Sequence, residues 1–191
     1  MKTKSIISLC LKSKKMAVFS DKDRKAQWLS SGDAMYLIDG LPEVTTEILC
    51  VMYDISDKNK EKMLLRDSVF DLTHISIKDV ADNEFSACPM DISLKVGANI
   101  LIPFETELGV FFINSEYLKP FADSKYETLV FTLRPSETKN EYYIAVKRGL
   151  LLEGIITPIK TTDDFVNKLG EIWNLSSTAL KNTKEKENGT E

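Results

Sequence analysis

The chain has 191 residues, of which 43% are hydrophobic and 28% charged, and its formal net charge is −4. That length accommodates one full domain or two small ones. No apolar stretch is long enough to span a bilayer, and the N-terminal run Ile6–Leu11 is too short, and too soon followed by lysines, for a signal peptide. We therefore expect a cytoplasmic protein with reduced thiols, in which Cys10 and Cys50 are buried and Cys88 is the most accessible.

The first 66 residues predict a β-meander followed by a pair of helices, which together form a candidate subdomain. Four short segments have the composition of strands and are separated by turn residues: Ser5–Leu11, Lys15–Ser20, Ala26–Ser30 and Ala34–Ile38.

Helical spacing follows the meander. Thr45 or Thr46 is a candidate N-cap for the first helix, and Ser56 is a candidate N-cap for a second helix that ends near residue 64. The apolar stripe predicted to face the core in the first helix consists of Ile48, Val51, Met52 and Ile55.

The helix pair has the spacing of a helix-turn-helix, but two residues argue against DNA reading by this motif. Lys60 stands where the second helix needs a buried side chain, and Asp54 stands in the turn where glycine is favoured. We interpret the segment as two packing helices.

Residues 67–90 are acidic and weakly patterned, and we interpret them as a long connection. The acids here and just beyond lack the alternating spacing and the glycine of a calcium loop, which favours a solvated loop over a metal site. These acids are Asp67, Asp71, Asp79, Asp82, Glu84 and Asp91.

Residues 91–180 predict an antiparallel sheet, because segments rich in β-branched and aromatic residues are joined by links too short for parallel crossovers. The predicted strands are Ile92–Val96, Asn99–Phe104, Val110–Ile113, Thr128–Leu133, Tyr142–Val146 and Leu150–Ile156.

A C-terminal helix is predicted from Asp163 to about Leu180, and residues 181–191, which contain no apolar residue, are predicted to be disordered. The side chains predicted to pack on the sheet are Phe165, Leu169, Ile172 and Trp173. The predicted fold class is α+β, with an antiparallel β-rich core and the C-terminal helix on the sheet.

No pattern in the chain predicts catalysis. His74 is the only histidine, which leaves no multi-histidine metal site, and we interpret it as a packed or solvated side chain. The glycines form no phosphate-binding loop, and no serine lies in a Gly-x-Ser-x-Gly motif. A nuclease-type site needs an acid shortly before its lysine, and Ala145 occupies that position relative to Lys147. We expect a protein that is not an enzyme, with no catalytic, metal-binding or cofactor-binding residues.

The charges are unevenly distributed. Residues 1–25 contain eight Lys and Arg residues against two acids, whereas residues 32–127 contain eighteen acids against eight bases. The basic end favours a nucleic-acid partner as an alternative interpretation, with lysines for phosphates and an aromatic ring for base stacking. The candidate residues are Lys12, Lys14, Lys15, Lys22, Arg24, Lys25 and Trp28. A pI near 5.2 favours instead lysines that decorate exposed turns around a core tryptophan.

Three passages carry a family resemblance: FSDKDRKAQWLSSGDAMYLIDGLPEVTTEILCVMYDI (Phe19–Ile55), YLKPF (Tyr117–Phe121) and RGLLLEGIITPI (Arg148–Ile159). They resemble proteins of phages and prophages of Firmicutes-type bacteria, a group without an assigned activity. The resemblance implies a setting in the bacterial host cytoplasm and supplies no catalytic residues. We predict a non-catalytic accessory or interaction protein that binds a host or phage protein or associates with itself, without a membrane partner.

Overall fold

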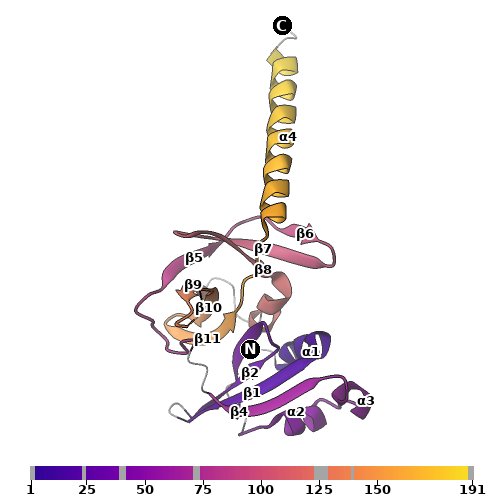
Figure 1. The fold of residues 1–191 in the computed structure, drawn as a ribbon, viewed down its shortest axis with the longest axis vertical. Coiled ribbons are helices and arrows are strands. Elements are labelled where there is room, and N and C mark those ends of the chain that lie inside the picture. The colour runs from indigo at the N-terminus through magenta and orange to yellow at the C-terminus, as the bar shows by residue number, and fades with distance from the viewer. Residues whose placement is uncertain are drawn as a thin grey trace. The chain divides into compact units, whose positions relative to one another are not determined.

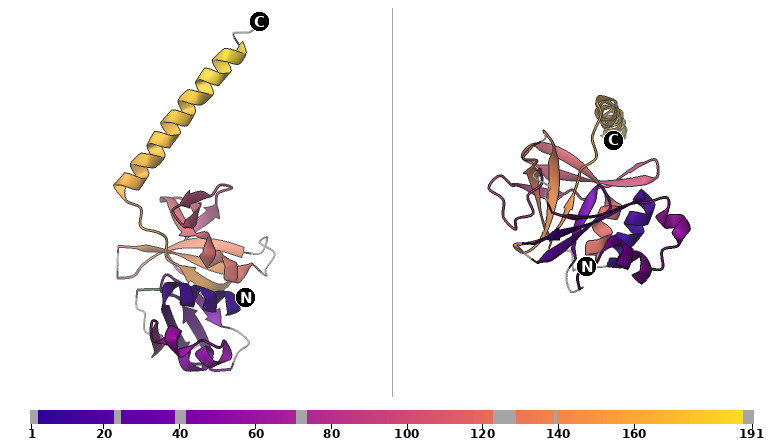
Figure 2. Two further views of the ribbon diagram at one scale, coloured as in Figure 1. Left: turned by 90° about the vertical axis from the view of Figure 1, so that its right-hand side faces the viewer. Right: turned by 60° about the horizontal axis from the view of Figure 1, so that its bottom comes forward.

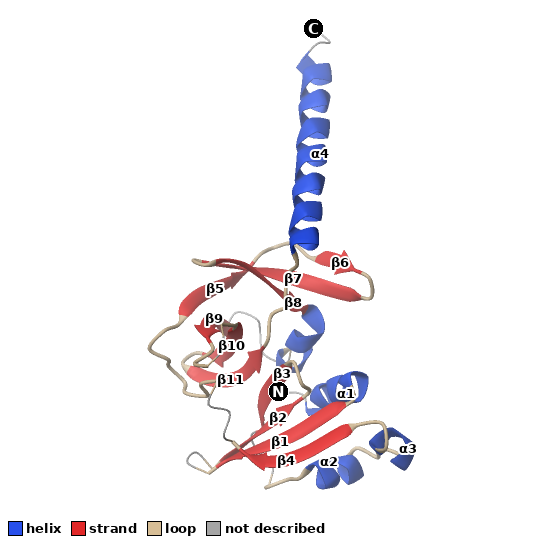
Figure 3. Ribbon diagram, in the orientation of Figure 1, coloured by secondary structure: helices blue, strands red, loops and turns tan. Residues whose placement is uncertain are grey.

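The computed structural model describes residues 3–22, 25–38, 42–70, 74–122, 129–138 and 140–188. Two compact units divide the chain, Met1–Ile159 and Lys160–Glu191. The described residues combine strands with helices (Figure 3), so the predicted α+β class is confirmed.

The described part of the first unit forms an eleven-stranded sheet (Figure 1). The strand order is β4-β1-β2-β3-β11-β10-β9-β5-β7-β6, and β8 pairs with β7. The strands are β1 (Lys15–Asp21), β2 (Ala26–Ser30), β3 (Ala34–Ile38), β4 (Leu64–Val69), β5 (Phe85–Pro89), β6 (Leu94–Val96), β7 (Asn99–Thr106), β8 (Gly109–Asn114), β9 (Leu129–Pro135), β10 (Tyr142–Arg148) and β11 (Leu151–Ile156).

The pairings in this sheet are antiparallel, as the short links predict, with one exception. β4 runs parallel to β1, and the long connection that a parallel pair needs is supplied by β2, β3 and the helices that follow them. β3 pairs with β11, with Tyr36 opposite Gly154. β1 to β4 therefore share one continuous sheet with the C-terminal strands.

Both faces of the central strands are buried. In β2, Leu29 belongs to one apolar cluster and Trp28 to another, and in β11 Ile156 and Ile155 divide in the same way. This alternation follows from the pleat, which points consecutive side chains to opposite faces. Strands buried on both faces appear in the sequence as nearly continuous apolar runs.

The first apolar cluster includes residues of three helical segments, α1 (Thr3–Ser13), α2 (Thr46–Met52) and the 3₁₀ helix η1 (Ser115–Phe121). α1 lies against η1 and the N-terminal strands (Figure 2). The second cluster packs against Phe70, Ile75 and Ile77, which precede β5.

The strand predicted at Ser5–Leu11 is wrong, because these residues belong to α1. Ile6 and Cys10 are one helical turn apart and are both buried, whereas Leu11 is 37% exposed. Lys14, at φ +58°, adopts left-handed backbone between the helix and β1. β-type composition misled the prediction, and the helical spacing of the buried residues is the better signal.

The N-cap predicted for the next helix is confirmed, since the Thr45 hydroxyl accepts a hydrogen bond from Ile48 N–H at 3.2 Å. The predicted buried face is wrong, except for Ile55 beyond the helix end. Val51 is 73% exposed, and Ile48 and Met52 are exposed as well. Thr46 donates from its N–H and hydroxyl to the carboxylate of Asp67 in β4, both at 2.8 Å, and this fixes the helix rotation. α3 (Asp57–Lys60) follows and has only four residues, fewer than predicted.

The connection predicted at residues 67–90 contains the second half of β4 and all of β5, and neither strand is predicted from the sequence. The charged pattern of β4, which reads LLRDSV, lacks a continuous apolar run because this strand lies at the sheet edge. β5 links two parts of the sheet by pairing with both β9 and β7.

The second unit contains α4 (Asp163–Asn188), a 26-residue helix. The helix begins at the residue where it is predicted to begin. It continues through residues 181–188, which the sequence predicts to be disordered. Ile172 and Trp173, two of the side chains predicted to pack on the sheet, are 60% and 73% exposed. Helical spacing identifies an apolar stripe without identifying what covers it.

Gly154 in β11 occupies a position where a side chain does not fit. A Cβ there would lie 2.4 Å from Cζ of Phe121 and 3.2 Å from the carbonyl oxygen of Met35. Phe121 is fully buried and packs on Tyr36, with 5.4 Å between the two ring centroids, so it has little freedom to move. Gly154→Ala should therefore lower the free energy of unfolding by roughly 1–3 kcal/mol in urea denaturation.

Gly170 in α4 provides the matched control, because a Cβ there meets nothing within 4 Å. Gly170→Ala should leave the unfolding of the sheet unchanged and favour the helix by up to about 1 kcal/mol. Equal unfolding curves for Gly154→Ala and the parent would contradict the packing described for Phe121.

Candidate functional site

The lysines predicted to contact nucleic acid lie at two separate places. Lys12, Lys14 and Lys15 lie at or before the start of β1, whereas Lys22 and Lys25 follow its end. A strand of this length separates its ends by roughly 20 Å. The structure therefore does not bring these lysines together into one patch.

The remaining predicted contacts are also unfavourable for nucleic acid. Lys12 forms an ion pair with Glu116 at 2.5 Å. The indole of Trp28 is completely buried in the second apolar cluster, so it is not accessible to stack on a base. Arg24 lies outside the described residues.

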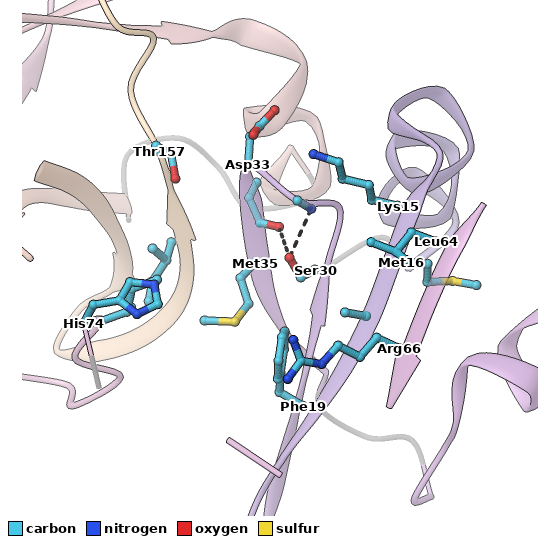
Figure 4. Close-up of a pocket in the computed structure, with 15 residues that line it drawn as sticks. Lys15, Met16, Phe19, Ser30, Asp33, Met35, Leu64, Arg66, His74 and Thr157 are labelled. Carbon is cyan, nitrogen blue, oxygen red and sulfur yellow. Dashed lines mark hydrogen bonds between the residues drawn. The ribbon is translucent and has the colours of Figure 1, made fainter. Parts of the chain in front are cut away.

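A pocket of about 270 Å³ lies on the side of the sheet that carries the second apolar cluster (Figure 4). β1, β3, β4 and the end of β11 contribute its lining, together with His74 and Ile75. Its apolar surface comes from three buried side chains of the second cluster, Phe19, Met35 and Ile155. The pocket is therefore built on the folded core rather than on surface loops alone.

Two cationic side chains line this pocket from neighbouring strands. In the parallel register Lys15 lies opposite Leu64 and Ala17 opposite Arg66. Residues two apart in a strand share a face, so Lys15 and Arg66 are diagonal neighbours on one face. Both residues are exposed, and no ion pair involves either of them within the described part of the chain.

The turn between β2 and β3 positions the lysine. Gly32 has φ +103°, and a Cβ on it would lie 2.8 Å from Cδ of Lys15. Glycine thus lets the lysine side chain lie closely over the turn. The nearby acid Asp33 already accepts a hydrogen bond from the Tyr117 hydroxyl at 3.0 Å.

His74 lies across the pocket from Lys15 and Arg66 (Figure 4). It is partly exposed, which agrees with the interpretation of a packed or solvated histidine. That His74 shares a pocket with two basic residues could not be predicted, because β4, which carries Arg66, is not predicted from the sequence.

A second group of charges is buried beneath the 74–84 loop (residues 74–84). Glu84 accepts hydrogen bonds from the Arg134 guanidinium, with Nη2 at 2.7 Å, and from Lys147 Nζ. The side chains of Arg134 and Lys147 are only 1% and 4% exposed. Arg134 also donates to three backbone carbonyls of the loop, those of residues 76, 78 and 79. The interpretation of Glu84 as a solvated acid is therefore wrong.

Neighbouring contacts also hold the 74–84 loop on the sheet. The Tyr143 hydroxyl accepts a hydrogen bond from Ser76 N–H at 2.8 Å. Asp79, also predicted to be solvated, accepts one from the N–H of Leu152 at 3.0 Å. We assign the cluster around Glu84 a structural role.

Substitution of Glu84 should reveal this role. Burial by itself raises the pKa of Glu84, but hydrogen bonds from Lys147 and Arg134 outweigh it and lower the pKa below its ordinary value. The stabilisation that ionised Glu84 provides through Lys147 and Arg134 is therefore fully present above the pKa of glutamate in the unfolded chain, about 4.3. It is lost as pH falls through the lower pKa that Glu84 has in the folded protein. Glu84→Gln should cost roughly 3 kcal/mol at pH 7, because two buried cations lose their counter-charge, and the cost should shrink below about pH 4.

Lys147→Met is the control, since Glu84 then keeps Arg134 as its partner. It should destabilise the protein less than Glu84→Gln in urea titrations at pH 7. A Glu84→Gln cost that stays constant from pH 7 to pH 3 would contradict the linkage.

The three cysteines are free, as predicted, with Cys10 and Cys50 buried and Cys88 exposed. Cys10 donates from Sγ to the carbonyl of Ser30 at 3.6 Å, and burial raises its pKa to about 12. Burial also raises the pKa of Cys50. A thiol with a raised pKa forms little of the reactive thiolate at neutral pH.

Thiol titration at pH 7.5 should therefore label one cysteine quickly and two only after denaturation. Cys88→Ser should abolish the fast phase and leave the slow labelling unchanged. A fast phase that survives Cys88→Ser would show that a buried thiol is accessible.

α4 carries an exposed apolar surface, here called the α4 apolar face. Its members repeat at heptad spacing: Val166, Trp173 and Leu180 in one row, Phe165 and Ile172 in a second, and Leu169 in a third. Val166, Ile172, Trp173 and Leu180 are 54%, 60%, 73% and 59% exposed, and Phe165 and Leu169 are half-buried. No described side chain of α4 is buried.

Comparison with known proteins returned no match to a family model, to a curated protein or to a solved structure. The resemblance to phage and prophage proteins therefore stays a prediction. Within the described ranges, no helix is both long and apolar enough to cross a membrane. Nor do the described His, Cys, Asp and Glu residues include a group of three placed to hold a metal ion.

Proposed function

We propose that this protein is a non-catalytic interaction protein that self-associates through the α4 apolar face. The observation that carries the proposal is the exposure of large apolar side chains at heptad spacing on a 26-residue helix. Exposed apolar surface of this kind marks interaction sites in soluble proteins.

The composition of α4 supports the need for a partner. The helix contains Gly170 and a run of weak helix formers, Asn174 and residues 176–178. Most helical stability in proteins comes from packing an amphipathic face rather than from intrinsic propensity. A helix with these residues is expected to gain stability when its apolar face is covered.

The heptad spacing supports a second helix as the covering element. Repeats of 3.5 residues keep one seam of a helix facing a neighbour along its whole length. The face occupies three of the seven heptad positions, which suits helices that pack in pairs or small bundles. A second copy of α4 supplies an identical seam.

Charge and size favour an antiparallel arrangement of the copies. Residues 163–175 contain three acids and one lysine, whereas residues 176–188 contain three lysines and two glutamates. Antiparallel pairing places each acidic half against a basic half. It also places Ile172 and Trp173, near the helix centre, against the small residues Ser176 and Ala179 of the other copy.

The biological setting is part of the proposal. The resemblance described above supports a phage or prophage protein in the host cytoplasm, in which self-association provides a platform for host or phage proteins. Nucleic-acid association through the basic N-terminal turns is the alternative, and the burial of Trp28 and the Lys12–Glu116 pair weigh against it.

Sedimentation equilibrium tests the proposal directly. The parent chain should sediment above its monomer mass of 21.6 kDa at about 100 µM. Ile172→Glu should return it to the monomer mass, because a carboxylate in an apolar seam is costly to bury. The helical circular dichroism signal should also fall, as α4 loses its partner.

Asn174→Glu is the matched control, since it adds the same charge to the same helix outside the α4 apolar face. It should leave the oligomer intact. A monomeric parent, or equal dissociation by both substitutions, would contradict self-association through this face.

A further inference from the structure

We infer that the pocket between β1, β3 and β4 binds a small organic anion, an aromatic carboxylate or phosphate monoester, with its charge on Lys15 and Arg66. This site lies in the first unit and is independent of the proposed role of α4. The two parts of the ligand correspond to the two parts of the pocket, its cationic rim and its apolar surface.

The cationic rim accounts for the charge of the ligand. Lys15 and Arg66 project from the same face of two paired strands, and neither has an acidic partner among the described residues. Both side chains line the same pocket, so both attract an anion that binds in it. The acid at the rim, Asp33, is engaged by Tyr117. Arginine and lysine are the residues that proteins use for carboxylates and phosphates.

The apolar surface accounts for the organic part. Phe19, Met35 and Ile155 line the pocket and belong to the second apolar cluster, so they are held in place by the core. A hydrated inorganic ion gains nothing from such a surface, whereas an aromatic ring does. The volume of about 270 Å³ is near the lower end of the range for ligand sites, which favours a small ligand.

The pocket has features of a preformed site. Gly32 allows Lys15 to lie across the β2–β3 turn, where a Cβ would meet the lysine at 2.8 Å. Ser30 fixes that turn, since its hydroxyl accepts from Gly32 N–H at 3.1 Å and donates to the carbonyl of Ala34 at 3.2 Å. His74, on the opposite wall, offers an imidazole for a further hydrogen bond.

His74 makes the test site-specific, because it is the only histidine in the chain. In untagged full-length protein, its imidazole gives a single set of NMR signals that reports on the pocket. Phenyl phosphate and benzoate should each shift these signals with saturation. Inorganic phosphate and benzyl alcohol, which each lack one half of the ligand, should bind at least about tenfold more weakly. Tighter binding of phenyl phosphate would indicate a phosphate monoester as the ligand, and tighter binding of benzoate would indicate a carboxylate.

Charge-removing variants then assign the contacts. Arg66→Gln and Lys15→Gln should each weaken binding of the better aromatic anion by about tenfold or more, as expected for charge-assisted hydrogen bonds. Both positions are exposed, so the fold should tolerate them, and unchanged thermal unfolding verifies this. Lys22→Gln and Lys25→Gln remove the same charge beyond the far end of β1 and should leave the affinity unchanged.

Three results would overturn the inference. The first is a His74 signal that neither aromatic anion moves at about 10 mM. The second is an affinity that Lys22→Gln reduces as much as Arg66→Gln does, which would indicate general electrostatic attraction. The third is inorganic phosphate binding as tightly as phenyl phosphate, which would exclude a role for the apolar surface.

Discussion

The shared ion pair of Glu84 with Arg134 and Lys147 is the interaction on which the rest of the first unit depends. It joins the 74–84 loop to β9 and β10 through two side chains that are almost fully buried. Buried charges are tolerated only when they are paired and hydrogen-bonded, and here the backbone carbonyls of the loop complete the bonding of the guanidinium. The loop in turn places Ile75 and Ile77 on the second apolar cluster. The burial of both faces of the central strands therefore rests partly on a polar contact.

The ion pairs of Glu84 also support one wall of the pocket, through the 74–84 loop. His74 begins the loop, and its neighbour Ile75 packs on the cluster that lines the pocket. The opposite wall depends on a different feature, the parallel pairing of β4 with β1, which brings Arg66 beside Lys15. Two long-range connections thus meet at one cavity, and neither is visible as a local motif. The α4 apolar face, by contrast, requires no long-range connection, since all its residues lie on one helix.

The sequence predicted well those elements that depend on local composition. β2 and β3 begin and end where the alternating and apolar patterns indicate, and the cap at Thr45 follows from side-chain chemistry within three residues. α1 was mistaken for a strand because its isoleucines favour β structure, and packing on the first cluster overrides that propensity. The charge cluster was not predictable, because Glu84 is separated by 50 and 63 residues from its two partners. The pocket was not predictable for the same reason, since it unites side chains that only the sheet topology brings together.

The pairing of β3 with β11 has a consequence for the synthesis of the protein. Tyr36 and Gly154 are neighbours in the sheet, yet more than a hundred residues of chain separate them. A ribosome adding roughly 5–20 residues per second needs on the order of 10 s to extend the chain from one to the other. Throughout that interval β3 is an open edge with unpaired backbone groups and apolar side chains, the kind of edge that pairs with other chains. The nascent N-terminal half is thus exposed to pairing with other chains until β11 emerges.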